Sequence, residues 1–300
     1  MKKVLVIVGP TAVGKSDFAI LCAKLFNGEI ISGDSIQVYK GFDIGSGKVK
    51  QNEMQGIVHH NLDIKEENGT YSTYEFQQRS RKLIDEINSR NKLPIIAGGT
   101  GLYIKSTLYD YDFKEQEEID YSKYDAMSNQ ELINQLKVKD PKSLEVIHPN
   151  NRKRLVRALA FYDVSGQAKS ENIANQKKEM LYDAMIIGCT LKRQELYDNI
   201  NLRVEKMFEA GLEDEVENLA NKVGFKAQAM QGIGYREFKG YFDGDIDIDT
   251  CKKLIQKNSR NFAKRQYTFF KNQLVVNWVD MASDKDIAIE KIKGWLNNDR

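Results

Sequence analysis

The strongest indication of the fold is the segment Gly9-Pro10-Thr11-Ala12-Val13-Gly14-Lys15-Ser16. It matches the pattern G-x-x-x-x-G-K-[S/T], in which glycines let backbone N–H groups converge on phosphate oxygens and the lysine adds a cation. A β-branched run from Lys3 to Val8 precedes it, and apolar residues at helical spacing follow it: Phe18, Leu21, Cys22 and Leu25. Strand, glycine loop and helix in this order predict a site for a di- or triphosphate; the alternative is an ordinary glycine turn.

Other apolar runs have the length and composition of buried strands: Glu29–Ser32, Leu93–Ala97, Ala184–Thr190 and Leu274–Val279. Stretches with helical periodicity separate them. Strands that alternate with helices are typical of an α/β fold, so we expect a P-loop NTPase-like core with a mainly parallel sheet.

The composition changes between Asp110 and Asp125, where seven carboxylates and three tyrosines occur without a strand pattern. The next 60 or so residues have helical periodicity. We therefore predict a P-loop catalytic core made of residues 1–112 and 184–300, interrupted by a helical insertion domain over residues 113–183.

The overall composition excludes several classes of protein. The 300 residues carry 45 basic and 43 acidic side chains, so a disordered tail, a collagen-like repeat and a strongly basic nucleic-acid coat are all ruled out. No apolar run approaches the ~18 residues of a membrane span, and we expect no membrane association. The three cysteines are far apart and lack metal-ligand spacing, which favours a reducing compartment and a cytoplasmic protein.

The loop does not say which phosphate ester it binds. A G-protein would need an N-K-x-D motif to read its base, and none is present. A typical P-loop ATPase has an aspartate at the end of a hydrophobic strand, yet Leu93–Ala97 runs into Gly98-Gly99-Thr100. The nucleotide-binding machinery is therefore incomplete.

Two polar residues follow predicted strands and so should lie at the carboxyl edge of the sheet, where ligands of open α/β sheets bind. Asp34 follows the second strand and could position a metal or act as a general base; it could equally cap the next turn. Thr100 follows another strand and could hydrogen-bond a substrate amine or phosphate, or serve as a plain helix N-cap.

Arg203 lies in a predicted helix, Gln194–Phe208, three residues after Ile200 and seven after Leu196. This spacing turns it toward the apolar side of the helix. A charge that faces a core needs a partner. The partner could be a phosphate, or a carboxylate in a structural salt bridge.

Two stretches are strongly basic. Residues Cys251 to Lys271 hold seven Lys or Arg and no acid, and Ile255, Phe262 and Phe269 mark the expected buried stripe of one helix. Arg152, Lys153, Arg154 and Arg157 open a helix of the predicted insertion. Two basic faces favour an extended polyanion such as RNA, although either cluster alone could be an ordinary solvated helix face.

Taken together, these residues resemble the tRNA dimethylallyltransferases, also called tRNA isopentenyltransferases, over nearly the whole chain. The resemblance rests on the residue 9–16 loop and on Asp34-Ser35-Ile36-Gln37-Val38-Tyr39-Lys40-Gly41, Gly98-Gly99-Thr100-Gly101-Leu102-Tyr103, His148-Pro149-Asn150-Asn151-Arg152-Lys153-Arg154, Gly211-Leu212-Glu213-Asp214-Glu215-Val216, Gly232-Ile233-Gly234-Tyr235-Arg236-Glu237 and Ala263-Lys264-Arg265-Gln266. The chain departs from the family's usual residues at Ser46-Gly47-Lys48-Val49 (often Thr-Ala-Lys-Pro), Gly232 (usually alanine) and Phe269 (usually tryptophan).

The resemblance implies transfer of a dimethylallyl group from dimethylallyl diphosphate to N6 of adenosine 37, beside the tRNA anticodon, with Mg²⁺ bound at Ser16. It implies that Asp34 is the general base, that Thr100 lies near the amine, and that Lys15 and Arg203 bind the diphosphate together with Gly9, Pro10, Thr11, Ala12, Val13, Gly14 and Ser16. By the same resemblance, the residues that contact the anticodon stem-loop are Asp34, Ser35, Ile36, Gln37, Thr100, Lys153, Arg154, Leu155, Val156, Arg157, Gln231, Gly232, Ile233, Gly234, Tyr235 and Arg236. We expect the enzyme to be a monomer.

Two other functions fit the loop. A small-molecule or nucleotide kinase would use Asp34 to activate a hydroxyl and would transfer phosphate from ATP. An RNA-binding NTPase switch would change its RNA affinity with the bound nucleotide and would form no modified RNA.

Overall fold

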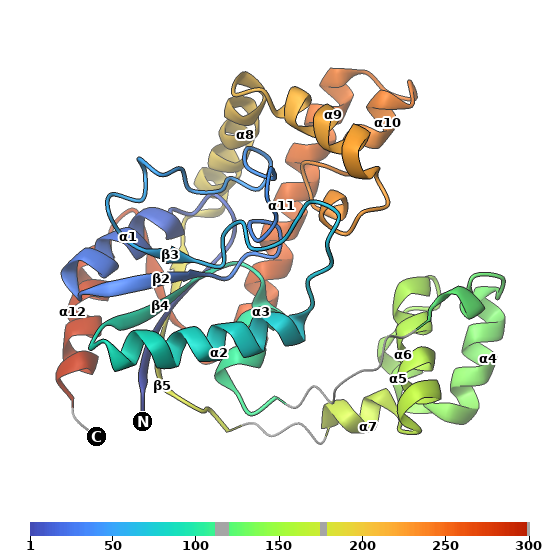
Figure 1. Cartoon of the computed structure of the whole chain (residues 1–300), viewed down its shortest axis with the longest axis horizontal. Helices are drawn as coiled ribbons and strands as arrows, with labels where there is room; N and C mark the ends of the chain where they lie inside the picture. The colour runs from blue at the N-terminus through green and yellow to red at the C-terminus, as the bar shows by residue number, and fades with distance from the viewer. Residues whose placement is uncertain (112–119, 175–178, 299–300) are drawn as a thin grey trace. The chain divides into compact units, whose positions relative to one another are not determined.

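The computed structural model describes residues 1–111, 120–174 and 179–298 of the chain (Figure 1). These form two compact units, one of Met1–Leu108 with Met180–Arg300 and the other of Tyr109–Glu179. The predicted boundary between residues 112 and 113 lies outside the described residues, as does much of the acidic stretch around it.

The first unit is built on a parallel sheet. Within the described residues it has six strands in the order β3-β2-β4-β1-β5-β6, and every pairing between neighbours is parallel. The strands are β1 (Lys3–Val8), β2 (Gly28–Ser32), β3 (His59–His60), β4 (Leu93–Gly98), β5 (Asp183–Thr190) and β6 (Asn277–Asp280). The predicted α/β fold with a parallel sheet is confirmed.

Two strands differ from the sequence prediction. The last one begins at Asn277, not at Leu274, because the preceding helix continues to Gln273 and Leu274 is its C-cap. Strand β3 has only two residues and was missed, since so short a segment carries no periodic signal.

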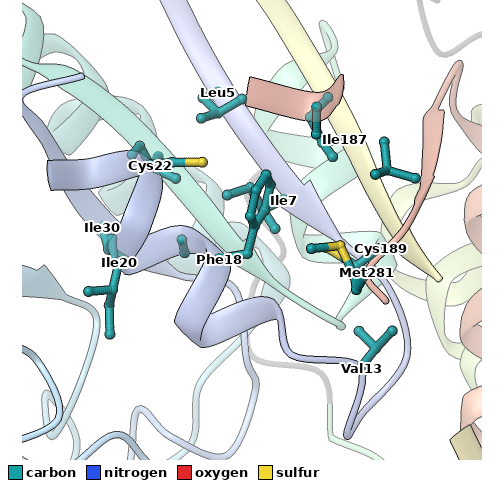
Figure 2. Packing of buried hydrophobic residues seen from close by; sticks show 14 of the residues in the cluster. Leu5, Ile7, Val13, Phe18, Ile20, Cys22, Ile30, Ile187, Cys189 and Met281 are labelled. Carbon is teal, nitrogen blue, oxygen red and sulfur yellow. The ribbon is translucent and has the colours of Figure 1, made fainter. Parts of the chain in front are cut away.

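The apolar core surrounds the strand that precedes the phosphate loop. Leu5 and Ile7 of β1 are fully buried in a cluster with residues of α1 (Lys15–Leu25), β5 and α12 (Lys285–Asn297). Figure 2 shows these β1 side chains beside Phe18 and Cys22 of α1. Helices α2 (Thr73–Ser89) and α3 (Gly101–Leu108) pack against each other and against β4. The loop at residues 9–14 is thus fixed at both ends by buried elements.

A second apolar cluster holds the long connection that follows β2. It combines that connection with α8 (Arg193–Glu209), α9 (Leu212–Val223), η2 (Ala229–Gln231), α10 (Phe238–Phe242) and α11 (Ile248–Gln273). Phe42 and Tyr235 are both fully buried, with ring centroids 4.9 Å apart. This packing keeps residues 38–47 close to α8 and α9.

The second unit is helical in its described residues, as expected for this segment. It contains η1 (Ser122–Tyr124), α4 (Asn129–Lys139), α5 (Pro141–Val146), α6 (Arg152–Ser165) and α7 (Lys169–Ala174). Leu132, Leu136, Leu155 and Leu159 form its own small core. In the described parts of the chain, we find no helix with the length and apolar character needed to cross a membrane.

A buried carboxylate ties β2 to its neighbours. Glu29 is 3% exposed, and its carboxylate lies 2.8 Å from His60 Nε2, 2.8 Å from Arg90 Nη2 and 3.0 Å from Lys92 Nζ. Burial raises the pKa of Glu29, but hydrogen bonds from His60, Lys92 and Arg90 outweigh it and lower the pKa to about 2.

We expect this carboxylate to stabilise the fold at neutral pH and to stop doing so in acid. Because the folded-state pKa is depressed, the contribution is complete above the unfolded pKa of about 4.3 and is lost as the pH falls toward 2. Glu29→Gln should cost on the order of 2 kcal/mol at pH 7 and about half as much near pH 3. Thermal unfolding of both proteins across this pH range measures the difference; a gap that does not narrow in acid contradicts the assignment.

Candidate active site

A cavity of about 430 Å³ opens where the parallel strands end. It gathers side chains from four separate parts of the sequence: Lys15 and Ser16 from the phosphate loop, Asp34 after β2, Thr100 after β4, and Arg203 from α8. Of the other predicted site residues, it is lined by Thr11, Ser35, Ile36, Gln37, Gln231, Gly232, Ile233, Gly234, Tyr235 and Arg236. The four residues predicted as catalytic thus line one cavity.

The phosphate loop leads directly into α1. Gly14 is the N-cap of that helix, with a φ of 86°, a left-handed conformation that glycine adopts without strain. Lys15 Nζ donates to the carbonyl oxygen of Pro10 at 2.5 Å. Burial lowers the pKa of Lys15 to about 8, because a charged ammonium is poorly solvated there. An anion in the cavity would stabilise that charge.

Asp34 caps the turn that follows it with one carboxylate oxygen, and the other oxygen could still accept a proton. Its Oδ1 accepts hydrogen bonds from the backbone N–H groups of Ile36 (2.8 Å) and Gln37 (3.3 Å). No hydrogen bond from the described residues reaches Oδ2. The turn therefore orients the carboxylate of Asp34, a residue that lines the cavity.

Thr100 precedes α3 without capping it through its side chain. Its backbone N–H donates to Gly33 at 3.2 Å and its carbonyl accepts from Ile104 at 3.3 Å. Within the described residues the hydroxyl makes no hydrogen bond. The threonine is thus held at the end of β4 by its backbone, and its hydroxyl is available to a ligand.

Arg203 lines the cavity, and a backbone carbonyl accepts a hydrogen bond from its guanidinium. Its Nη2 donates to the carbonyl oxygen of Ser46 at 3.2 Å, and none of the ion pairs among the described residues includes it. Burial lowers the pKa of the guanidinium, while the nearby charge of Asp34 raises it. The structural salt bridge considered from sequence is not formed in this part of the chain, so the arginine retains its capacity to bind an anion.

Comparison with known proteins identifies the family. A family model described as IPP transferase matches residues 37–273, which is most of the chain. The chain belongs to the IPP transferase family. The resemblance drawn from the sequence motifs is confirmed.

Relatives of this IPP transferase family member align along nearly their whole length. A protein named tRNA dimethylallyltransferase from Anoxybacillus flavithermus is 48% identical over 285 residues, covering 94% of this chain and 92% of its own. The protein of the same name from Bacillus subtilis is 43% identical over 294 residues, covering 96% and 94%.

Solved structures agree with this assignment. The tRNA δ(2)-isopentenylpyrophosphate transferase of Staphylococcus epidermidis superimposes with a TM-score of 0.74 at 40% identity, covering 99% of both chains. A eukaryotic dimethylallyltransferase acting on tRNA gives a TM-score of 0.83 at 27% identity, covering 97% of this chain and 78% of its own.

The residues that form the buried stripe of the basic helix α11 differ from those predicted. The buried positions are Cys251, Ile255, Ala263, Gln266 and Phe270, whereas Phe262 and Phe269 are only half-buried. Residues seven positions apart on a straight α-helix are rotated by about 20° relative to one another. Phe262 and Phe269 are therefore turned progressively away from the buried direction of Ile255. Phe262 and Arg265 instead line the cavity.

The basic cluster of α6 divides into two groups. Lys153, Arg154 and Arg157 are exposed, whereas Arg152 turns inward and donates to the carbonyl oxygens of Tyr124 (2.5 Å) and Met127 (2.5 Å). Leu155 is fully buried in the core of the helical unit. Leu155 was predicted to contact tRNA, but its side chain packs inward and cannot make that contact.

Two residues with no predicted role support the cavity wall. Gln266 Nε2 donates to Gly99 at 3.0 Å and its Oε1 accepts from the N–H of Thr11 at 3.1 Å, so this side chain joins the phosphate loop to the end of β4. Glu215 accepts several backbone N–H groups of the connection after β2. Both lie on the buried faces of their helices, and this helical spacing is the signal that could have revealed them.

Proposed function

We propose that the chain transfers the dimethylallyl group of dimethylallyl diphosphate to N6 of adenosine 37 in the anticodon loop of tRNA, acting as a monomer and releasing diphosphate. Membership of the IPP transferase family makes it an enzyme that transfers a dimethylallyl group to tRNA. The observation that carries the finer assignment is that one cavity is lined by Lys15, Arg203 and Asp34. Among the described residues, neither cation has an acid partner, and Oδ2 of Asp34 accepts no hydrogen bond.

The cationic side of the cavity suits the diphosphate. The glycine loop and the first turn of α1 offer backbone N–H groups, and Lys15 and Arg203 supply charge that would stabilise the leaving group as its negative charge develops. A prenyl diphosphate has no base to recognise, which explains why the motifs for base recognition are missing from this P-loop protein.

The carboxylate side of the cavity suits the acceptor. The adenine amine is a weak nucleophile because its lone pair is delocalised, so loss of a proton must accompany attack. As the new N6–C1 bond forms, the C1–O bond to diphosphate breaks, and Asp34 Oδ2 takes the amine proton. Thr100 would orient the amine through its hydroxyl. The base must leave its stack to reach the cavity, which in a single-stranded loop costs only a few kcal/mol.

The residues present fit a Mg²⁺ ion that arrives with the substrate. Ser16 Oγ and the Asp34 carboxylate are hard oxygen donors on the same cavity, but the described residues contain no group of three His, Cys, Asp or Glu side chains that could hold a metal alone. Mg²⁺ commonly binds through one or two protein oxygens plus substrate phosphates and water. When bound, the ion would neutralise charge on the departing diphosphate.

Both units offer surfaces for tRNA. In the first, residues 34–37, Thr100 and residues 231–236 line the cavity that would receive the base. In the second, which we propose as the tRNA-binding insertion of residues 113–183, the exposed side chains of Lys153, Arg154 and Arg157 would contact phosphates. Half-buried Val156 lies beside them on α6.

The direct test is mass analysis of hypomodified tRNA after incubation with dimethylallyl diphosphate, Mg²⁺ and the protein. We expect one adenosine of the anticodon loop to gain a five-carbon group. Transfer of phosphate from ATP with no change in the RNA would favour the kinase alternative and refute the proposal.

Neutralising the exposed basic cluster should weaken tRNA binding and reduce its salt dependence. Changing Lys153, Arg154 and Arg157 to Gln would remove about three phosphate contacts, so the slope of log K against log[salt] should become shallower by roughly two to three. Filter binding between 50 and 200 mM salt measures the slope, with Lys142→Gln in α5 as a single-charge reference. A slope equal to that of the wild type would make the cluster an ordinary solvated helix face.

A further inference from the structure

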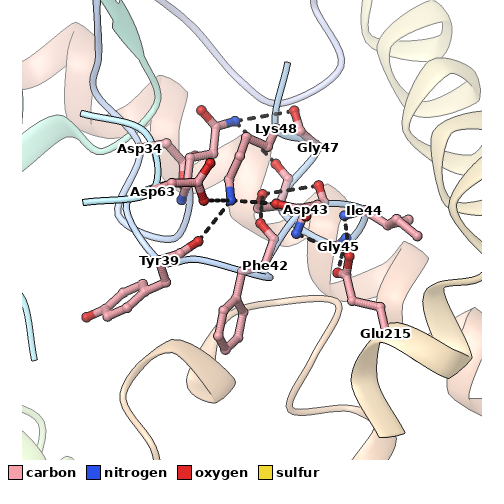
Figure 3. A network of polar contacts seen from close by, with 12 residues as sticks. Asp34, Tyr39, Phe42, Asp43, Ile44, Gly45, Gly47, Lys48, Asp63 and Glu215 are labelled. Atoms are coloured by element: carbon pink, nitrogen blue, oxygen red, sulfur yellow. Dashed lines mark hydrogen bonds and ion pairs between the residues drawn. The ribbon is translucent and has the colours of Figure 1, made fainter. Parts of the chain in front are cut away.

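The connection after β2 contains a short segment, residues 43–47, and the first three of its backbone N–H groups converge on one carboxylate. Glu215, in the first turn of α9, accepts the N–H groups of Asp43 (3.1 Å) and Ile44 (2.7 Å) on Oε2, and that of Gly45 (3.0 Å) on Oε1. Figure 3 shows this carboxylate against the segment. Three successive backbone donors on one side chain define the local path of the chain.

Tyr235 extends the same arrangement by one residue. Its hydroxyl donates to Glu215 Oε1 at 2.9 Å and accepts the N–H of Ser46 at 3.0 Å. The ring is fully buried against Phe42, and burial raises the pKa of the phenol well above its usual value, so the hydroxyl keeps its proton. Four consecutive N–H groups therefore end on the Glu215–Tyr235 pair.

The far end of the segment touches Arg203. The carbonyl of Ser46 accepts the hydrogen bond from Arg203 Nη2 at 3.2 Å. Gly47 lies against the same guanidinium, since a Cβ at this position would come within 1.9 Å of Nη2. A methyl group at residue 47 would therefore require the guanidinium to shift from this position.

These contacts form a chain of support from α9 to the cavity. The Ser46 N–H that Tyr235 holds and the Ser46 carbonyl that receives Arg203 belong to one residue, so rotation of either peptide unit would move the acceptor. No carboxylate among the described residues fixes the guanidinium instead. The direction in which Arg203 points into the cavity therefore depends on the shape of residues 43–47.

We propose that Glu215, together with Tyr235, is a positioning residue that aims Arg203 at the diphosphate of the donor substrate. The proposal rests on the proposed function, in which Arg203 binds that diphosphate. Glu215 itself touches no substrate: its contacts are to backbone N–H groups and to the Tyr235 hydroxyl, and its effect reaches the donor only through Ser46 and Arg203.

The alternative is that Glu215 merely stabilises the fold, and a double-mutant cycle separates the two. Glu215→Gln keeps the size of the side chain but replaces one acceptor oxygen by an NH₂ group that faces N–H donors. We would measure the affinity for inorganic pyrophosphate with Mg²⁺ by calorimetry in the wild type, Glu215→Gln, Arg203→Ala and the double variant. Glu217→Gln, an exposed position on the same helix, removes the same charge and is the matched control.

We expect Glu215→Gln to weaken pyrophosphate binding by about 10-fold, the lower end of what the loss of an outer hydrogen-bond partner costs at metal sites. In the Arg203→Ala background the same change should have an effect of less than about twofold, because the group that it positions is gone. Affinity for tRNA should stay within about twofold, and Glu217→Gln should bind like the wild type.

Two results would overturn the inference while leaving the proposed function intact: wild-type affinity in Glu215→Gln, or an equal loss with and without Arg203. Wild-type affinity in Arg203→Ala would instead refute the diphosphate role of that arginine and, with it, this inference. Should Glu215→Gln fail to fold, Tyr235→Phe would replace it in the same cycle with a smaller expected loss, because it removes the acceptor for the Ser46 N–H and the hydroxyl that donates to Glu215 but leaves the three backbone N–H groups on the carboxylate.

Discussion

Asp34→Asn should lower kcat by about 10²- to 10⁴-fold and leave tRNA affinity within about twofold. The asparagine amide oxygen can still accept the N–H groups of Ile36 and Gln37 that Asp34 Oδ1 accepts, so the turn is retained. An amide cannot take the proton of the adenine amine. Single-turnover transfer to tRNA under saturating donor, combined with filter binding, separates the chemical step from binding.

Two control variants separate the effect of losing the turn from the effect of losing the proton acceptor. Asp34→Ala loses both the proton acceptor and the turn, so it should be at least as slow as Asp34→Asn. Asp214→Asn, at an exposed position of α9, removes the same charge far from the turn and should be as active as the wild type. Loss of tRNA binding in Asp34→Asn with an unchanged kcat would contradict its assignment as the base.

The parts of the fold that could be predicted from sequence are those with strong local signals. The β1 strand, the phosphate loop and α1 follow one another within 25 residues, and each is specified by its own residues: β-branched run, glycines and apolar spacing. The second site segment, Asp34, was found for the same reason, since it directly follows a buried strand. Local sequence therefore placed the loop and the edge of the sheet.

What the sequence left open depended on contacts between distant residues. From local pattern alone Asp34 could be either a turn cap or a base, and the structure shows that Oδ1 caps while Oδ2 remains free of described partners. Arg203 could have faced a carboxylate; only the folded chain shows that its partner is the carbonyl of Ser46, 157 positions away.

The supporting residues were missed because their function is defined by backbone groups elsewhere. Glu215 holds N–H groups about 170 positions away, and Gln266 joins two loops that precede it by more than 160 residues. A side chain that hydrogen-bonds to backbone N–H and C=O groups can do so whatever the residue type of its partner. The partner's sequence therefore contains no motif that would reveal the contact. Position on a buried helix face was the available sign.

Lys15 should make donor binding pH-dependent, with the change above neutrality. Burial lowers the pKa of its ammonium to about 8 in the free protein, and only the charged form attracts a diphosphate. Bound diphosphate would raise this pKa. Affinity should thus change little near pH 7 and fall as the pH rises through 8, up to tenfold per pH unit. The donor's phosphates have already titrated near pH 6, so they do not produce this change.

Lys15→Met should weaken donor binding or turnover by about 10²-fold or more at pH 7, because a buried, preorganised cation opposite the diphosphate is lost. It should also remove the pH dependence, since Arg203 stays charged throughout the range. Lys24→Met, at the exposed end of the same helix, should keep both the affinity and the slope of the wild type. Calorimetric titration of the donor from pH 7 to 9.5 tests this, and a wild-type affinity that does not change with pH would show that the charge of Lys15 takes no part in binding.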